Sequence, residues 1–185
     1  MPVDVQPARP VALICAITAR DENILAEARG KLADQRGPIR LQGPVYPFDY
    51  TTYYADEMGQ NLIKQLIWFE ELVDPAVLPH AKHQTMEVEI ELAEYSEGKI
   101  RRRVNIDPGL VSIESLVLAS TKYSGHRICI APGLYAETTL LFKKKRYSPF
   151  EWTYSDYQTD EVQVFLQEIR AHLLPRRTTP ARPPA

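Results

Sequence analysis

The first strong pattern in the chain is an uninterrupted apolar run over residues 11–18. Its β-branched members and its lack of polar alternation predict a strand that is buried on both faces. Asp21 then stands in a capping position before apolar residues at helical spacing, which predict a helix to about residue 34. Gly37 and Pro38 are typical of the end of such a helix.

Two further segments are predicted to be extended. Residues 39–46 resume an extended pattern, and Pro44 and Pro47 confine it to a sheet edge or a bend because proline cannot donate a backbone hydrogen bond. Residues 62–73 have a spacing that fits either a strand or a helix. Their β-branched and aromatic content favours the strand.

A long helix is predicted to begin at Asp74, which can cap it, with Pro75 as its first residue. We expect this helix to reach about residue 95. Residues 86–92 alternate between polar and apolar positions as a strand does, so a strand is the second interpretation of that stretch. The cap, the length and the helix-forming glutamates favour the helix.

A turn and a capped helix are predicted in the middle of the chain. Residues 99–107 have the pattern of a strand. The Asp-Pro-Gly sequence at 107–109 predicts a tight turn, because proline pre-sets φ and glycine accepts the positive φ that follows. Ser112 then predicts the N-cap of a helix over residues 112–121.

The last third of the chain predicts a loop, a hairpin and a helix. Residues 122–127 are polar and contain Gly125, which indicates a loop. Residues 127–130 and 135–142 predict the two strands of a hairpin joined by a Pro-Gly turn. Apolar residues at helical spacing predict a final helix that starts at residue 159 or 160 and ends at about 174.

These elements predict a single α+β domain over residues 10–174 with a largely antiparallel sheet and helices on one face. The order is β-α-β-β-α-β followed by α-β-β-α, and the first six elements fit a ferredoxin-like unit that the others extend. We expect residues 1–9 to be a loose lead-in. Residues 175–185 have almost nothing to bury and are expected to be a disordered tail.

Composition narrows the class of protein. A net charge of −2 over 185 residues argues against a dedicated nucleic-acid binder. The chain has no run of about 18 apolar residues, so we expect no membrane span and a cytoplasmic location. Cys15 and Cys129 both lie in apolar runs, which indicates buried, reduced thiols.

Several stretches resemble one protein family. The motifs that carry the resemblance are, in chain order, FDYTTYYADEMG, RRVNIDPG, SIESLVLASTK, HRICIAPGLYAETTL and WTYSDY. Together they are similar to the DUF4416 family of bacterial proteins, over roughly residues 10–174. The resemblance implies a small single-domain bacterial protein and assigns no catalytic residues.

The first candidate group for binding chemistry is Lys122, His126 and Arg127. Arginine binds phosphate or carboxylate through two parallel hydrogen bonds, and lysine binds as a point charge. Asp107 begins the predicted turn before the predicted helix, whose N-terminus also favours anions. The alternative is that the three cationic side chains only complement the helix dipole at its C-terminus.

The second candidate group is a short tyrosine-rich and acidic segment. Aromatic rings beside carboxylates can stack on a ligand ring, hydrogen-bond it or hold a divalent cation. The alternative is an edge segment whose tyrosines pack with their hydroxyls in water. Its members are Asp49, Tyr50, Tyr53, Tyr54, Asp56 and Glu57.

The third candidate group is Glu137 with Tyr135, together with Trp152, Tyr154 and Asp156. Glu137 and Tyr135 would share one face of the predicted strand. If that face lines a cleft, Glu137 is a candidate general base. The alternative is that Glu137 forms a cross-strand pair with a basic residue.

Metal and nucleotide signatures are weak in this sequence. His80, His83 and Glu87 would lie on one side of a helix, but isolated histidine pairs are common on helix surfaces, so we predict no metal site. The arginine run at 101–103 is better explained as solvated charge than as an RNA contact. No phosphate-loop or dinucleotide-binding glycine motif is present.

The leading hypothesis is an enzyme or binding protein for an anionic small molecule, such as a nucleotide or a sugar phosphate. The sequence leaves the cofactor unknown. The alternatives are a non-catalytic interaction protein, homodimeric or bound to a partner, and an RNA-binding module. Candidate acid–base or cation-binding residues are Glu57, Asp107 and Glu137. Candidate ligand-binding residues are Tyr53, Tyr54, Lys122, His126, Arg127, Trp152 and Asp156.

Overall fold

Strand β1 (Val11–Ala19) lies inside the sheet, and all nine of its residues are buried. It pairs antiparallel with β4 (Leu62–Val73) on one side and with β7 (Val104–Val111) on the other. The computed structural model describes residues 6–50, 53–96 and 98–175. The strand that the sequence predicts at 11–18, buried on both faces, is therefore confirmed.

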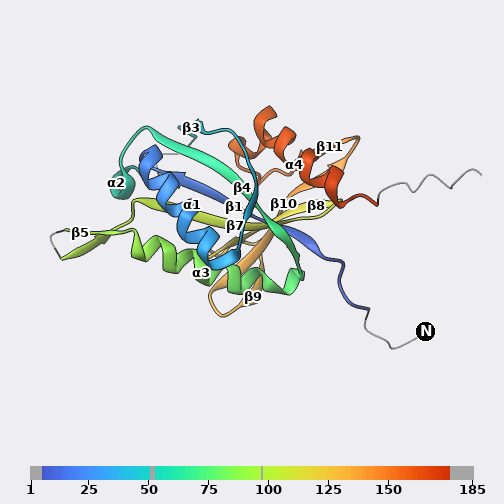
Figure 1. Ribbon diagram of the computed structural model, residues 1–185, viewed down its shortest axis with the longest axis horizontal. Helices are drawn as coiled ribbons and strands as arrows, with labels where there is room; N and C mark the ends of the chain where they lie inside the picture. The colour runs from blue at the N-terminus through green and yellow to red at the C-terminus, as the bar shows by residue number, and fades with distance from the viewer. Residues whose placement is uncertain (1–5, 51–52, 97, 176–185) are drawn as a thin grey trace, which may run out of the picture.

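The main sheet has nine strands in the order β11-β10-β8-β7-β1-β4-β2, with β3 paired to β4 and β9 to β10 (Figure 1). Its other strands are β2 (Ile39–Gln42), β3 (Tyr46–Phe48), β8 (Ser115–Ser120), β9 (Ile128–Ala131), β10 (Leu134–Lys143) and β11 (Arg146–Pro149). A separate two-stranded sheet consists of β5 (Glu94–Ser96) and β6 (Lys99–Arg101). Within the described residues every pairing is antiparallel, which confirms a single α+β domain with a largely antiparallel sheet.

Helices cover both faces of the sheet. Helices α1 (Glu22–Arg36) and α3 (Leu78–Glu91) pack on one face, whereas α4 (Asp160–Leu173) packs on the opposite face (Figure 1). The shorter helices are α2 (Ala55–Met58), η1 (Pro75–Val77) and η2 (Ser155–Gln158). The prediction that the helices share one face is wrong, because β1 presents apolar residues on both faces and each needs cover.

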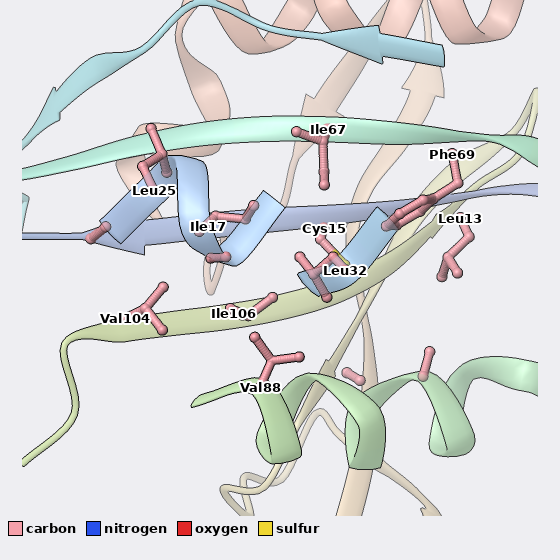
Figure 2. Close-up of a cluster of buried hydrophobic side chains, with 14 of the residues drawn as sticks. Leu13, Cys15, Ile17, Leu25, Leu32, Ile67, Phe69, Val88, Val104 and Ile106 are labelled. Carbon is pink, nitrogen blue, oxygen red and sulfur yellow. The ribbon is translucent and has the colours of Figure 1, made fainter. Parts of the chain in front are cut away.

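The larger core lies between the sheet and the helices α1 and α3. Figure 2 shows Leu13, Cys15 and Ile17 of β1 in the same cluster as Leu32 of α1 and Val88 of α3. The alternate residues of β1 belong to the second core, beneath α4. Each face of β1 therefore contributes to a different core. Within the described ranges, no helix is long and apolar enough to span a membrane.

Most predicted elements are confirmed near their predicted bounds. Asp21 caps α1 by accepting a hydrogen bond from the Ile24 amide, and Asp74 accepts one from the Ala76 amide before α3. The segment 62–73 is a strand, the hairpin of β9 and β10 is present, and Thr159 caps α4. The strand interpretation of 86–92 is wrong, because the buried residues of α3 recur at helical spacing.

The predicted turn at 107–109 and the predicted helix at 112–121 are both wrong. Residues 107–109 lie inside β7, and most of the expected helix is strand β8. Ser112 does cap a local element, since its Oγ accepts hydrogen bonds from the Glu114 and Ser115 amides, but that element is the turn of a β7–β8 hairpin. The same serine chemistry serves helix starts and turns, so the cap did not decide between them.

Gly109 is needed for close packing and not for a positive φ. A Cβ atom at this position would lie 2.6 Å from Leu118 Cδ2 and 3.1 Å from the Val117 carbonyl oxygen. Leu118 is the residue that pairs with Gly109 across the β7–β8 ladder. The glycine therefore lets two adjacent strands accommodate a large side chain.

The ladder between β7 and β8 stops at the Gly109–Leu118 pair. Towards its start, β7 continues to pair with β1 as far as Val104, while β8 continues to pair with β10 as far as Ser120. Pro108, next to the last pair, has no backbone N–H to donate. The sheet consequently opens into a fork between β7 and β8.

Other predictions differ in detail or lie outside the description. Cys15 is buried as predicted, but the prediction that Cys129 is buried is wrong, because this thiol is exposed. The helix predicted to reach about residue 95 ends at Glu91, and β5 follows it. The strand predicted over 99–107 is divided between β6 and β7, and strand β11 was not predicted. Residues 1–5 and 176–185 fall outside the described residues, so the lead-in and the disordered tail stay predictions.

We expect Gly109→Ala to lower the free energy of unfolding by about 1–3 kcal/mol, because the added methyl group overpacks the β7–β8 contact. Gly30→Ala is the matched control, since a Cβ there meets nothing within 4 Å. In the middle of α1 it should instead raise stability by about 0.5–1 kcal/mol. Urea unfolding followed by circular dichroism measures both, and equal effects of the two changes would contradict the packing argument.

Candidate functional site

A pocket of about 350 Å³ occupies the fork between β7 and β8. This volume lies in the range of small-molecule sites. Its wall includes residues of β3, β4, α3, β7, β8, β10, η2 and the loop after β8. Segments that are distant in the sequence therefore converge on one cavity. The hypothesis of a single site for an anionic small molecule, with candidate residues from separate segments, needs such convergence.

Charged and aromatic side chains dominate the lining. The cationic residues are Lys64, Lys82, Arg102, Lys122 and Arg127. The acidic residues are Glu89, Asp107, Glu137 and Asp156. The aromatic residues are Phe48, Tyr53, Tyr54, Tyr154 and Tyr157. Such a lining can hold a polar, charged ligand with an apolar portion.

Lys64 of β4 is a buried lysine with a buried partner. Its Nζ donates a hydrogen bond to Asp156 Oδ2, and the two side chains are only 5% and 2% exposed. The same Nζ lies 4.8 Å from the ring centre of Phe48 and 4.5 Å from that of Tyr157. Because an unpaired buried charge is costly, this pair needs both partners to be present.

Lys82 of α3 is the second buried lysine. Its Nζ donates to the Ile106 carbonyl at 2.9 Å and to Asp107 Oδ1 at 3.2 Å. Glu89 Oε1 lies 3.9 Å from the same nitrogen and accepts a hydrogen bond from the Ile106 amide. Helix α3 is thereby anchored to the edge of β7 that faces the fork.

Asp107 is the most exposed of the four carboxylates that line the cavity. Its side chain is 31% exposed, against 7% for Glu89 and 4% for Glu137. Lys82 holds Oδ1, and Asn105 Nδ2 donates to Oδ2 at 2.8 Å, so the group has a defined orientation. Burial raises the pKa of Asp107. The nearby ammonium groups of Lys82 and Lys64 lower it by more than burial raises it, so the net pKa is below its ordinary value.

The other carboxylates are committed to protein contacts. Arg102 donates to both oxygens of Glu57, at 2.8 and 2.7 Å, and these hydrogen bonds lower the pKa of Glu57. Burial raises the pKa of Glu89, although Lys82 opposes that shift. Glu137 accepts a hydrogen bond from Arg127 Nε, and its Oε2 lies 3.0 Å from His126 Nε2. These groups hold the pocket wall together.

Arg127 organises the loop that follows β8. Its Nε donates to Glu137 Oε2 at 2.7 Å. Its Nη1 donates to Ser120 Oγ at 3.1 Å and to the Lys122 carbonyl at 2.8 Å. Lys122 itself has no ion-pair partner among the described residues, and its Nζ lies 3.5 Å from the ring centre of Tyr53. Lys122 is therefore the cation best able to meet an anion in the cavity.

His126 and Trp152 lie behind the pocket wall and do not line the cavity. The His126 ring stacks on Trp152 with the ring centres 4.8 Å apart, and Trp152 stacks on Phe150. His126 also lies within hydrogen-bond distance of Ser124 Oγ and Glu137 Oε2. The structure thus gives these two residues a supporting position.

The structure brings most of the sequence-predicted site residues to the cavity. Those that line it are Tyr53, Tyr54, Asp107, Lys122, Arg127, Glu137, Tyr154 and Asp156, whereas Tyr135 does not line it. Glu57, His126 and Trp152 are not among the lining residues. Asp49 and Tyr50 do not line it either, and the side chain of Asp56 lies outside the description.

Sequence reasoning missed Lys64, Lys82, Glu89 and Asn105. One signal was available for two of them. Lys82 and Glu89 are seven residues apart on the apolar face of α3, where a charged side chain normally needs a partner. No comparable sequence signal marks the other two. The prediction that the arginine run is solvated charge is wrong for Arg102, whose side chain is 26% exposed and pairs with Glu57 and Glu89.

No group of three or more His, Cys, Asp or Glu side chains in the described ranges is arranged to hold a metal ion.

Comparison with known proteins identifies the family. A family model described as a domain of unknown function, DUF4416, matches residues 9–173. The chain belongs to the DUF4416 family. No curated protein and no solved structure matches the chain, so the ferredoxin-like description of this DUF4416 domain stays a prediction.

The buried pair of Lys64 and Asp156 generates a stability prediction. We expect Lys64→Met and Asp156→Leu each to lower the free energy of unfolding by about 3–5 kcal/mol, because each leaves one buried charge without its partner. The double variant should be more stable than either single variant, since both charges are gone. Urea unfolding of the four proteins measures this. Additive losses would show that the two charges are not coupled.

The depressed pKa of Asp107 generates a pH prediction. An ionised aspartate with a native pKa below the unfolded value of about 3.9 stabilises the fold at neutral pH, and this contribution is lost as the pH falls below about 4. Asp107→Asn should therefore be less stable than the wild type at pH 7, and the difference should shrink below pH ~4. Urea unfolding across this pH range measures the effect. A constant difference would contradict the assignment.

Proposed function

We propose that the DUF4416 domain binds an anionic small molecule in this pocket, as an enzyme or as a binding protein, with a nucleotide or a sugar phosphate as the ligand class. One observation carries the proposal: five cationic side chains from separate segments line one cavity, and two of them are almost fully buried lysines. Burying charge is expensive, so such an arrangement is typical of functional sites.

Lys122 is proposed to contact the anionic group of the ligand. It lies in the loop after β8, and the described residues include no carboxylate within ion-pair distance of it. A lysine ammonium binds phosphate as a point charge. Arg127, which the sequence also suggested for this role, is proposed to hold the loop in place instead, because its guanidinium is committed to Glu137, Ser120 and the Lys122 carbonyl.

Asp107 is proposed as the carboxylate that acts on or binds the ligand. Of the three acidic candidates from the sequence, Glu57 is tied to Arg102 and Glu137 is 4% exposed. Asp107 is both oriented by two hydrogen bonds and open to the cavity. A lowered pKa keeps it ionised at neutral pH, as a proton acceptor must be.

A thermal-shift screen against nucleotides and sugar phosphates, followed by calorimetric titration of the hits, tests the proposal. A ligand at about 100 times its Kd should add roughly 2.7 kcal/mol to stability. Lys122→Ala should weaken binding about tenfold or more, because it removes a charged contact. Arg127→Ala is a poorer test, since it would also leave Glu137 without its partner.

Lys99→Ala is the matched control for Lys122→Ala. Lys99 is an exposed lysine of β6 that does not line the cavity, and its removal changes the net charge by the same amount. Its affinity should equal that of the wild type. Equal losses in the two variants would show that only the overall charge matters, and a flat screen would contradict the proposal itself.

A further inference from the structure

We infer that one part of the pocket lining, formed by Lys82, Arg102, Asn105 and Asp107 and here called the floor, recognises a polyhydroxylated group. The ligand is then a phosphorylated sugar, with its phosphate near Lys122 and its hydroxyls near Asp107. This inference rests on the proposed function and narrows it to one substrate class. It depends on which chemical groups the floor can accept and on which aromatic faces are already occupied.

The floor is a chain of alternating hydrogen-bond donors and acceptors. Arg102 Nη1 donates to Asn105 Oδ1 at 3.0 Å, and Asn105 Nδ2 donates to Asp107 Oδ2 at 2.8 Å. Lys82 Nζ donates to the other oxygen of Asp107 at 3.2 Å. A hydroxyl group both donates and accepts, so neighbouring hydroxyls of a sugar can engage the carboxylate and the adjacent donors together.

A phosphate is poorly suited to the same floor. Its oxygens accept hydrogen bonds, and the ionised carboxylate of Asp107, which is 31% exposed, would repel them. Lys122 offers a cation without a carboxylate partner in the described part of the chain. In this proposal the anionic group of the ligand therefore binds at Lys122 and its neutral hydroxyls bind at the floor.

Three of the five aromatic rings that line the pocket, those of Phe48, Tyr53 and Tyr157, lie close to a lysine ammonium. Lys64 Nζ lies over the rings of Phe48 and Tyr157, at 4.8 and 4.5 Å from the ring centres. Lys122 Nζ lies 3.5 Å from the ring centre of Tyr53. A nucleobase needs an open aromatic face for stacking and would compete with these contacts. A sugar needs no such face, which favours it over a nucleotide.

Isothermal titration with defined probes tests the inference. The probes are glucose 6-phosphate and ribose 5-phosphate, their 2-deoxy analogues, AMP, UMP and inorganic phosphate. We expect at least one of the two sugar phosphates to bind at least tenfold more tightly than inorganic phosphate and both nucleotides. Its 2-deoxy analogue should bind about five- to tenfold more weakly, because a hydrogen bond to a charged group is lost.

Asp107→Asn provides a second, independent readout. It should weaken sugar phosphate binding about tenfold while inorganic phosphate binds at least as well as to the wild type, because the repulsion is gone. Thermal unfolding checks that the Asp107→Asn variant is folded. If the variant is not folded, the comparison of the sugar phosphates with their deoxy analogues still tests hydroxyl recognition in the wild-type protein.

The possible failures are distinguishable. Tighter binding of AMP or UMP than of both sugar phosphates would overturn the sugar assignment and leave the anionic-ligand proposal standing. Equal affinities for the sugar phosphates and their deoxy analogues would do the same. No binding by any probe would overturn both.

Discussion

The burial of β1 on both faces is the constraint on which the rest of the fold depends. Eight of its nine buried residues alternate between two cores, one beneath α1 and α3 and the other beneath α4. A strand of this kind is stable only when other strands take up its backbone hydrogen bonds and helices cover each face. The helices on both faces, and the place of β4 and β7 beside β1, follow from that requirement.

The pocket exists because the sheet does not stay closed. β7 follows β1 and β8 follows β10 beyond the Gly109–Leu118 pair, so the two strands separate. The Asp-Pro-Gly sequence has a different task from the turn that its composition suggests. Its aspartate faces the cavity, its proline lacks a donor where the ladder ends, and its glycine admits Leu118.

Buried charges connect the elements that surround this opening. Lys64 ties β4 to η2 through Asp156, and Lys82 ties α3 to β7. Apolar residues of similar size would hold the same segments together at lower cost, so stability alone does not account for charges in these positions. Asp107, which belongs to this network and is also open to the cavity, connects the framework of the fold with the proposed chemistry.

Local pattern by itself determined the first strand, helices α1 and α4 and the hairpin of β9 and β10, and it favoured helix α3 and strand β4 over their alternatives. Each carries its own periodicity or its own cap. It also singled out eight of the residues that line the cavity as site candidates. The tertiary structure alone decided that residues 112–121 are not a helix, because a serine cap and a short apolar run suit a hairpin equally well. It also decided that Arg127 supports a loop, that Lys64 and Lys82 are buried, and that Asp107 is accessible. Burial, partners and access depend on what folds back against each residue, and a linear pattern does not contain that information.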